Sequence, residues 1–126
     1  ILNQEWKVFL QSRRTKVDTQ VFRYGWVGDY NAPYTFAEIL DSKHGLNDMA
    51  YDNPRYDELL LQASREADPA ARMALLEEAE RIMLDDMPVL PIYYYVSNQM
   101  VKPWVAGYES NIMDHHHTRH FRILKH

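Results

Sequence analysis

The sequence contains no cysteine and only four glycines among its 126 residues. The absence of cysteine excludes disulfides, thiolate metal sites and a cysteine nucleophile, and it is compatible with either an oxidising or a reducing compartment. No apolar run approaches the length of a membrane span. The first residues also lack the basic and apolar blocks of a signal peptide, so we expect the sequence to begin at a cut end.

Clustered basic residues and catalytic patterns are also missing. Fourteen Lys and Arg stand against 18 Asp and Glu, a net charge of −4, and the basic residues are scattered. Phosphate binding needs clustered cations, so we expect no nucleic-acid partner. There is no Gly-rich phosphate loop, nucleophile elbow or catalytic pair of carboxylates. The sequence therefore predicts neither an enzyme nor a bound cofactor.

Aromatic residues, in contrast, are abundant. They make up 13% of the chain, with nine Tyr and three Trp. Tyr and Trp combine a large contact area with a polar group and few rotatable bonds, which suits binding surfaces as well as cores. Composition alone leaves both uses open.

Four helices are predicted from apolar spacing and capping signals. Residues 3–14 form an amphipathic pattern whose apolar stripe should lie on a sheet. Thr35 is expected to cap a short helix that runs through Leu40. Two longer helices begin at Asn53-Pro54 and Asp68-Pro69, where a capping side chain precedes a proline. They are expected to bury Tyr56, Leu59, Leu60 and Ala63, and Leu75, Leu76, Ala79, Ile82 and Met83, respectively.

Strands are predicted where β-branched and aromatic residues gather between turn formers. These stretches are residues 19–27, 89–96 and 121–124. Alternation places Tyr93 and Tyr95 on one face of the second strand and Tyr94 on the other. Helices and strands in this order predict an α/β layer. Residues 41–52 are expected to form a surface loop, and little apolar material follows residue 97 to close a core.

Asp29 stands at the end of the first predicted strand, beside two aromatic residues. Carboxylates are seldom fully buried without a partner, so this position suggests a cationic partner such as a ligand amine. Asp followed by Asn and Pro is also a common turn sequence. Residue types alone leave both interpretations open.

The histidines near the end of the chain raise the hypothesis of a metal-binding module. They are His115, His116, His117 and His120. His117 and His120 have a spacing that suits zinc on a helix. Consecutive histidines point in different directions, however, and the region has no helical pattern. A metal site is therefore the remote alternative.

Several motifs, in the same order, resemble the periplasmic oligopeptide-binding proteins, the solute receptors of peptide ABC transporters. The motifs are LNQEWKVFL, GWVGDYNAP, NPRYDELL, PVLPIYYYV, VKPWVAGY and ILKH. The resemblance spans nearly all 126 residues. Family members are several times longer, so the chain resembles only their C-terminal portion.

The resemblance implies an α/β fold: part of a type II periplasmic-binding-protein lobe, with a mixed sheet flanked by helices. Residues 1–96 would belong to the C-terminal ligand-binding lobe, and residues 97–126 would cross the hinge and return to the N-terminal lobe. It implies a periplasmic location, an oligopeptide ligand, a membrane-embedded ABC permease as partner, and no cofactor or metal. The alternative within the family is a murein tripeptide receptor.

The resemblance also assigns ligand-binding roles to individual residues. Asp29 would pair with the α-amino group of the peptide. Trp26 and Trp6 would line side-chain pockets. Arg13 and Arg23 would face peptide carboxylates, with Arg14 as the alternative to Arg13 because the chain is one residue longer here. Tyr95 would line the cavity on the hinge strand. The stretch from Glu109 to Arg119 has no counterpart in the family pattern.

Overall fold

Local capping signals fix where the two longest helices begin. The computed structural model describes residues 3–17 and 20–125. Helix α3 spans Pro54–Arg65, and the Asn53 side chain accepts hydrogen bonds from Arg55 N and Tyr56 N at 3.0 and 3.3 Å. Helix α4 spans Pro69–Asp86, and Asp68 accepts from Ala71 N at 2.8 Å. Both predicted starts are confirmed.

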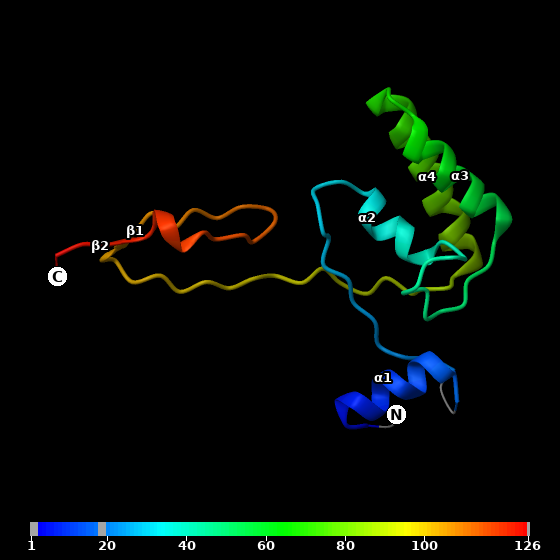
Figure 1. Ribbon diagram of the computed structural model, residues 1–126, viewed down its shortest axis with the longest axis horizontal. Helices are drawn as coiled ribbons and strands as arrows, with labels where there is room; N and C mark the ends of the chain where they lie inside the picture. The colour runs from blue at the N-terminus through cyan, green and yellow to red at the C-terminus, as the bar shows by residue number, and fades with distance from the viewer. Residues whose placement is uncertain (1–2, 18–19, 126) are drawn as a thin grey trace. The chain divides into compact units, whose positions relative to one another are not determined.

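Helices α3 and α4 pack against each other and hold the core of the first unit (Figure 1). The chain divides into two units, Ile1–Leu90 and Pro91–His126. Every residue predicted to be buried by α3 is buried, whereas α4 buries Leu76 and Ala79 and leaves the other predicted positions, Leu75, Ile82 and Met83, partly covered. The buried residues are Thr35, Ile39, Leu40, Tyr56, Leu59, Leu60, Ala63, Leu76 and Ala79.

The short helix before this pair begins differently from the prediction. Helix α2 spans Tyr34–Ala37 and continues as the 3-10 helix η1, Glu38–Leu40. Pro33 occupies the N-cap position, and the Thr35 side chain does not cap the helix. Thr35 is fully buried, and its hydroxyl instead accepts a hydrogen bond from Asp29 N. The predicted cap is therefore wrong, because a contact with the preceding segment uses that hydroxyl.

Helix α1 forms as predicted but buries no residue. It spans Trp6–Thr15, with Glu5 as N-cap and Lys16 in the left-handed conformation at its end. The Glu5 carboxylate accepts from Lys7 N at 2.9 Å and Val8 N at 3.3 Å. No sheet lies under its apolar stripe in the part of the chain that the structure describes.

The expected mixed sheet is absent among the described residues, whose one sheet has two strands. The predicted strand at 19–27, described from residue 20 on, is extended but has no ladder partner, and residues 89–96 form no strand either. Residues 22–28 nonetheless alternate in burial, with even-numbered positions half-buried and odd-numbered positions exposed. The strand pattern is therefore present without the neighbouring strands that would complete it.

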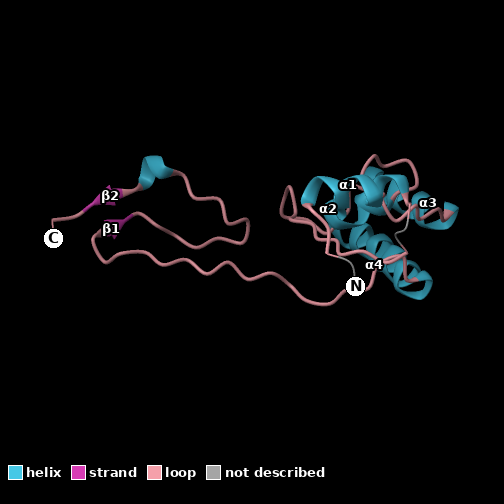
Figure 2. Ribbon diagram, turned by 90° about the horizontal axis from the view of Figure 1, so that it is seen from below, coloured by secondary structure: helices cyan, strands magenta, loops and turns pink. Residues whose placement is uncertain are grey.

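The second unit is built around a small hairpin. Strands β1 (Val105–Ala106) and β2 (Arg122–Ile123) are antiparallel, with Val105 opposite Ile123 (Figure 2). The strand predicted at 121–124 is thus confirmed. Gly107 has φ 86°, and a Cβ there would collide with the His120 carbonyl, so only glycine fits this position. The 3-10 helix η2, Thr118–His120, precedes β2.

Candidate functional site

The backbone of Asp29 is fixed, while its carboxylate is exposed. Asp29 N donates to the buried Thr35 Oγ1 at 3.1 Å. The side chain lies at the exposed end of the extended segment and makes no hydrogen bond or ion pair within residues 3–17 and 20–125. A positioned carboxylate without a partner is suited to bind a cation.

Gly28 allows this arrangement by letting the segment approach α2 closely. A Cβ at Gly28 would lie 3.0 Å from Phe36 Cζ and 3.1 Å from Thr35 Cγ2. These distances are tighter than ordinary van der Waals contacts. The glycine therefore permits the Asp29–Thr35 hydrogen bond to form.

The neighbouring tyrosine is hydrogen-bonded to a second carboxyl side chain near this end of the segment. Tyr30 Oη donates to Glu38 Oε1 at 3.1 Å. Burial, the hydrogen bond to Glu38 and the charges of Glu38 and Asp29 together raise the pKa of Tyr30 to about 12. The phenol therefore stays protonated and uncharged at neutral pH.

The two tryptophans predicted to line pockets lie in different surroundings. Trp26 is half-buried and packs against the core, and its indole Nε1 is buried without a hydrogen-bond partner in the described ranges. Trp6 lies on α1, is 63% exposed and stacks on Phe9 with ring centroids 5.6 Å apart. Trp6 has an open face, whereas Trp26 presents a buried donor that lacks an acceptor.

The predicted cationic residues also differ in their surroundings. Arg13 Nε lies 2.7 Å from Asp48 Oδ2, and both side chains are mostly buried. Arg14 and Arg23 are exposed, Arg23 on the same outer face of the extended segment as Val27. The structure therefore pairs Arg13 internally and leaves Arg14 and Arg23 at the surface.

Tyr95 belongs to the second unit. It is 62% exposed, and its ring contacts that of Tyr93 at 5.0 Å, which agrees with the prediction that both lie on one face. The other predicted ligand-binding residues, Trp6, Arg13, Arg23, Trp26 and Asp29, all belong to the first unit.

The histidine-rich segment forms a hydrogen-bonded cluster. Asp114 accepts from Ser97 Oγ at 2.8 Å, and its other oxygen lies 2.7 Å from His116 Nε2. Hydrogen bonds from His116 and Ser97 lower the pKa of Asp114, and Tyr108 stacks on the His116 ring at 4.5 Å. Within the described residues, no group of three or more His, Cys, Asp or Glu side chains could hold a metal ion.

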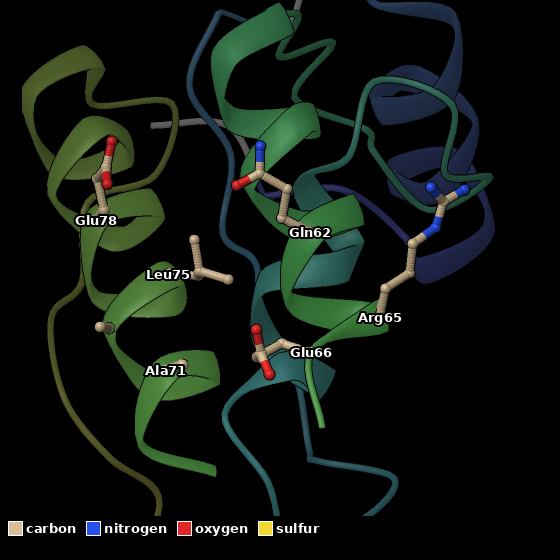
Figure 3. A pocket seen from close by; sticks show the side chains of 7 residues that line it. Gln62, Arg65, Glu66, Ala71, Leu75 and Glu78 are labelled. Carbon is tan, nitrogen blue, oxygen red and sulfur yellow. The ribbon is translucent and has the colours of Figure 1, made fainter. Parts of the chain in front are cut away.

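A shallow groove of about 570 Å³ lies between α3 and α4 (Figure 3). Leu75 points toward α3 at its centre, between Gln62 on α3 and Glu78 on α4. None of the predicted ligand-binding residues lines it. In the described part of the chain, no helix has both the length and the apolar character needed to cross a bilayer.

Three residues at the site were missed by sequence reasoning. Gly28 carried a usable signal, because a glycine inside a strand pattern often marks a close backbone approach. Thr35 was recognised only as a cap. Asp48 lies in a polar loop where its sequence neighbours give no sign of a distant arginine.

Solved structures identify the class of fold to which the chain corresponds. The Escherichia coli murein tripeptide binding protein MppA matches with a TM-score of 0.87 and 43% identity, covering 99% of this chain and 25% of that one. Haemophilus influenzae OppA in complex with the peptide RPPGFSPFR matches with a TM-score of 0.85 and 36% identity, and the match covers 98% of this chain and 24% of that one. The chain thus has the fold of a portion of a periplasmic peptide-binding protein.

The curated relatives agree with the structures. The chain is 43% identical over 125 residues to the Escherichia coli periplasmic murein peptide-binding protein MppA, covering 98% of this chain and 23% of the relative. It is 38% identical over 127 residues to the periplasmic oligopeptide-binding protein OppA of the same organism, and the match covers 100% of this chain and 23% of the relative. No protein-family model matches.

The chain is homologous to the periplasmic oligopeptide- and murein peptide-binding proteins and spans about 23% of their length. The relatives are periplasmic solute-binding proteins and not enzymes. The resemblance found in the sequence motifs is therefore confirmed.

Proposed function

We propose that the chain supplies one wall of a periplasmic receptor that binds oligopeptides and delivers them to a membrane-embedded ABC permease. The exposed Asp29 carboxylate, which is unpaired in the described residues and whose backbone N–H donates to Thr35 Oγ1, carries the proposal. It pairs with the α-amino group of the peptide through a charge-assisted hydrogen bond. The similarity to OppA, whose solved structure contains a nine-residue peptide, supports this ligand class.

In this proposal, residues 1–96 belong to the C-terminal lobe of a type II binding protein, and residues 97–126 cross the hinge to the N-terminal lobe. The extended residues 20–28 and 89–96 take their places in a mixed sheet whose other strands come from the rest of the receptor. Their strand-like sequences and the burial alternation at residues 22–28 support this assignment.

The anchor is tested by isothermal titration calorimetry on the complete receptor carrying Asp29→Asn. We expect peptides with a free α-amino group to lose about tenfold to a hundredfold in affinity, the range for one charge-assisted hydrogen bond. N-acetylated peptides should bind the variant and the unmodified receptor equally. Asp52→Asn, which removes the same charge from another exposed residue, is the matched control. Unchanged affinity for free-amine peptides would rule out the anchor.

A murein peptide is the second candidate ligand, favoured by the 43% identity to MppA over 98% of the chain. Competition between a murein tripeptide and a set of ordinary tripeptides on the complete receptor separates the two. Preferential displacement by the murein peptide would assign the receptor to that ligand. Equal displacement would assign it to oligopeptides in general.

A further inference from the structure

Thr35 is the one buried polar side chain in the described ranges, residues 3–17 and 20–125. Its Oγ1 accepts a hydrogen bond from Asp29 N at 3.1 Å. Its Cγ2 lies 3.1 Å from where a Cβ on Gly28 would stand. The hydroxyl and the methyl group of Thr35 therefore contact two successive residues of the extended segment, at the end that carries the exposed carboxylate.

The hydroxyl of Thr35 is not required to fill the core at this position. Threonine and valine share the same β-branched shape, so a valine would occupy the same space. A buried hydroxyl also costs free energy unless it forms a hydrogen bond. What threonine has and valine lacks is an acceptor for the Asp29 N–H. The role that needs the oxygen atom is therefore the contact with Asp29.

This hydrogen bond fixes the backbone from which the Asp29 carboxylate projects. Once the backbone is held, only the two side-chain torsions of Asp29 set the position of the carboxylate. The next residue is held as well, because Tyr30 Oη donates to Glu38 Oε1 at 3.1 Å. A carboxylate that is already restricted loses less conformational freedom when a ligand binds, which favours affinity.

The same hydrogen bond also decides which groups residue 29 can offer to a ligand. A free backbone N–H beside a carboxylate would donate to a carbonyl or carboxylate oxygen of the ligand. Because Thr35 already accepts from Asp29 N, the carboxylate oxygens are left to meet the ligand without a neighbouring donor. An ammonium group gains a charge-assisted hydrogen bond from such an acceptor, whereas an acylated nitrogen carries no charge and gains less.

We propose that Thr35 is a positioning residue that also determines specificity. It holds the backbone of Asp29 and occupies its N–H, so that the carboxylate alone meets the ligand and selects a free ammonium group over an acylated one. The inference rests on the proposed function and deepens it, because Thr35 acts through Asp29. A merely structural threonine would alter the stability of the receptor without altering this selectivity.

The test is calorimetry on the complete receptor with two probes, trialanine and N-acetyl-trialanine. Thr35→Val should lower the affinity for trialanine by about threefold to tenfold, the range for one neutral hydrogen bond, and change that for the acetylated probe by less than about twofold. Thr15→Val is the matched control, since it removes a hydroxyl that bonds to Gln11 O on α1. It should change neither affinity.

The conservative variant separates binding from stability. Thr35→Ser keeps the oxygen and removes a buried methyl group, so it should lower the free energy of unfolding while retaining the preference for trialanine. Thr35→Val keeps the shape and should lose part of that preference. A preference that falls with stability in both variants, or that neither variant changes, would overturn the inference.

A double-mutant cycle tests whether Thr35 acts through the carboxylate. In an Asp29→Asn receptor, adding Thr35→Val should not weaken trialanine further, and additive losses would contradict the proposal. Hydrogen exchange of the Asp29 amide gives a measurement that needs no variant. We expect slowed exchange with and without trialanine, and protection that appears only on binding would also overturn the inference. An unmodified receptor that does not prefer trialanine to its acetylated form would instead count against the proposed function.

Discussion

Gly28 controls how closely the segment before Asp29 approaches α2. The nearest atoms to a methyl group placed on its α-carbon would be Phe36 Cζ and Thr35 Cγ2, at 3.0 and 3.1 Å. Thr35 is fully buried and cannot move outward without opening the core. The position of the Asp29 backbone therefore depends on the lack of a side chain one residue earlier.

We predict that Gly28→Ala lowers the free energy of unfolding by about 1–3 kcal/mol, the usual cost of forcing an extra carbon into a packed site. The same change should weaken peptide binding, because it displaces Asp29. Chemical denaturation and calorimetry measure the two effects. Gly45→Ala is the control, since a Cβ there meets nothing within 4 Å. Equal stability of the two variants would contradict this account of Gly28.

For single residues, the sequence indicates what kind of role a side chain has better than it indicates which residue the side chain contacts. Asp29 stood out because a charge ended an apolar run, and the structure leaves its carboxylate exposed. Thr35 was expected at a helix cap, but its hydroxyl bonds to a residue six positions earlier. Asp48 was not singled out, because a salt bridge between residues 35 positions apart leaves no local pattern.

Among the elements, Asp86 links the C-terminal end of α4 to the N-terminal end of α3. This carboxylate, the last residue of α4, accepts hydrogen bonds from Tyr51 Oη and Asn53 Nδ2, both at 2.6 Å. Asn53 is also the N-cap of α3. Asp86 therefore connects the end of one helix to the start of the other.

The contribution of Asp86 to stability should depend on pH. The hydrogen bonds from Tyr51 and Asn53 lower its pKa below the usual value of 3.8. A lowered pKa in the folded state means that the contribution is fully present above the unfolded pKa and is lost as the pH falls through the folded value. We predict that Asp86→Asn destabilises the protein at about pH 7 and that the difference disappears in strong acid. Denaturation at several pH values measures this difference, with exposed Asp85→Asn as the control. A difference that is independent of pH would contradict the prediction.

Helices were predicted more accurately than strands because their signals are local. Asn53-Pro54 and Asp68-Pro69 carry both the cap and the first helical residue, and both helices begin there. A strand, in contrast, is defined by its neighbours, and residues 22–28 show the expected alternation without any. The period of two is encoded in the segment, whereas the partner strands are not.

For the whole chain, the unpaired extended segments leave large apolar side chains in solvent. Val21 and Tyr94 are 93% and 97% exposed. The other strongly exposed apolar residues in these segments are Val27, Leu90, Ile92 and Val96. Strong exposure of several large apolar side chains along a segment is typical of surfaces that another part of a protein covers.

We predict that the 126-residue chain alone binds a hydrophobic dye such as ANS, and that the complete receptor, with its sheet assembled, binds much less per molecule. Fluorescence titration at equal molar concentrations measures the difference. The charged variant Val21→Lys/Tyr94→Lys should reduce dye binding by the isolated chain. Equal dye binding by the isolated chain and the complete receptor would show that the rest of the protein does not cover these segments.

The hydrogen bond from Asp29 to Thr35 also bears on the order of folding. It closes a loop of six residues, a step that costs little chain entropy and is fast. Pairing of residues 20–28 with distant strands requires long-range closure, which is slow. The turn that presents the carboxylate can therefore form before residues 20–28 pair with distant strands. The position of the Asp29 carboxylate would then be set before the sheet assembles.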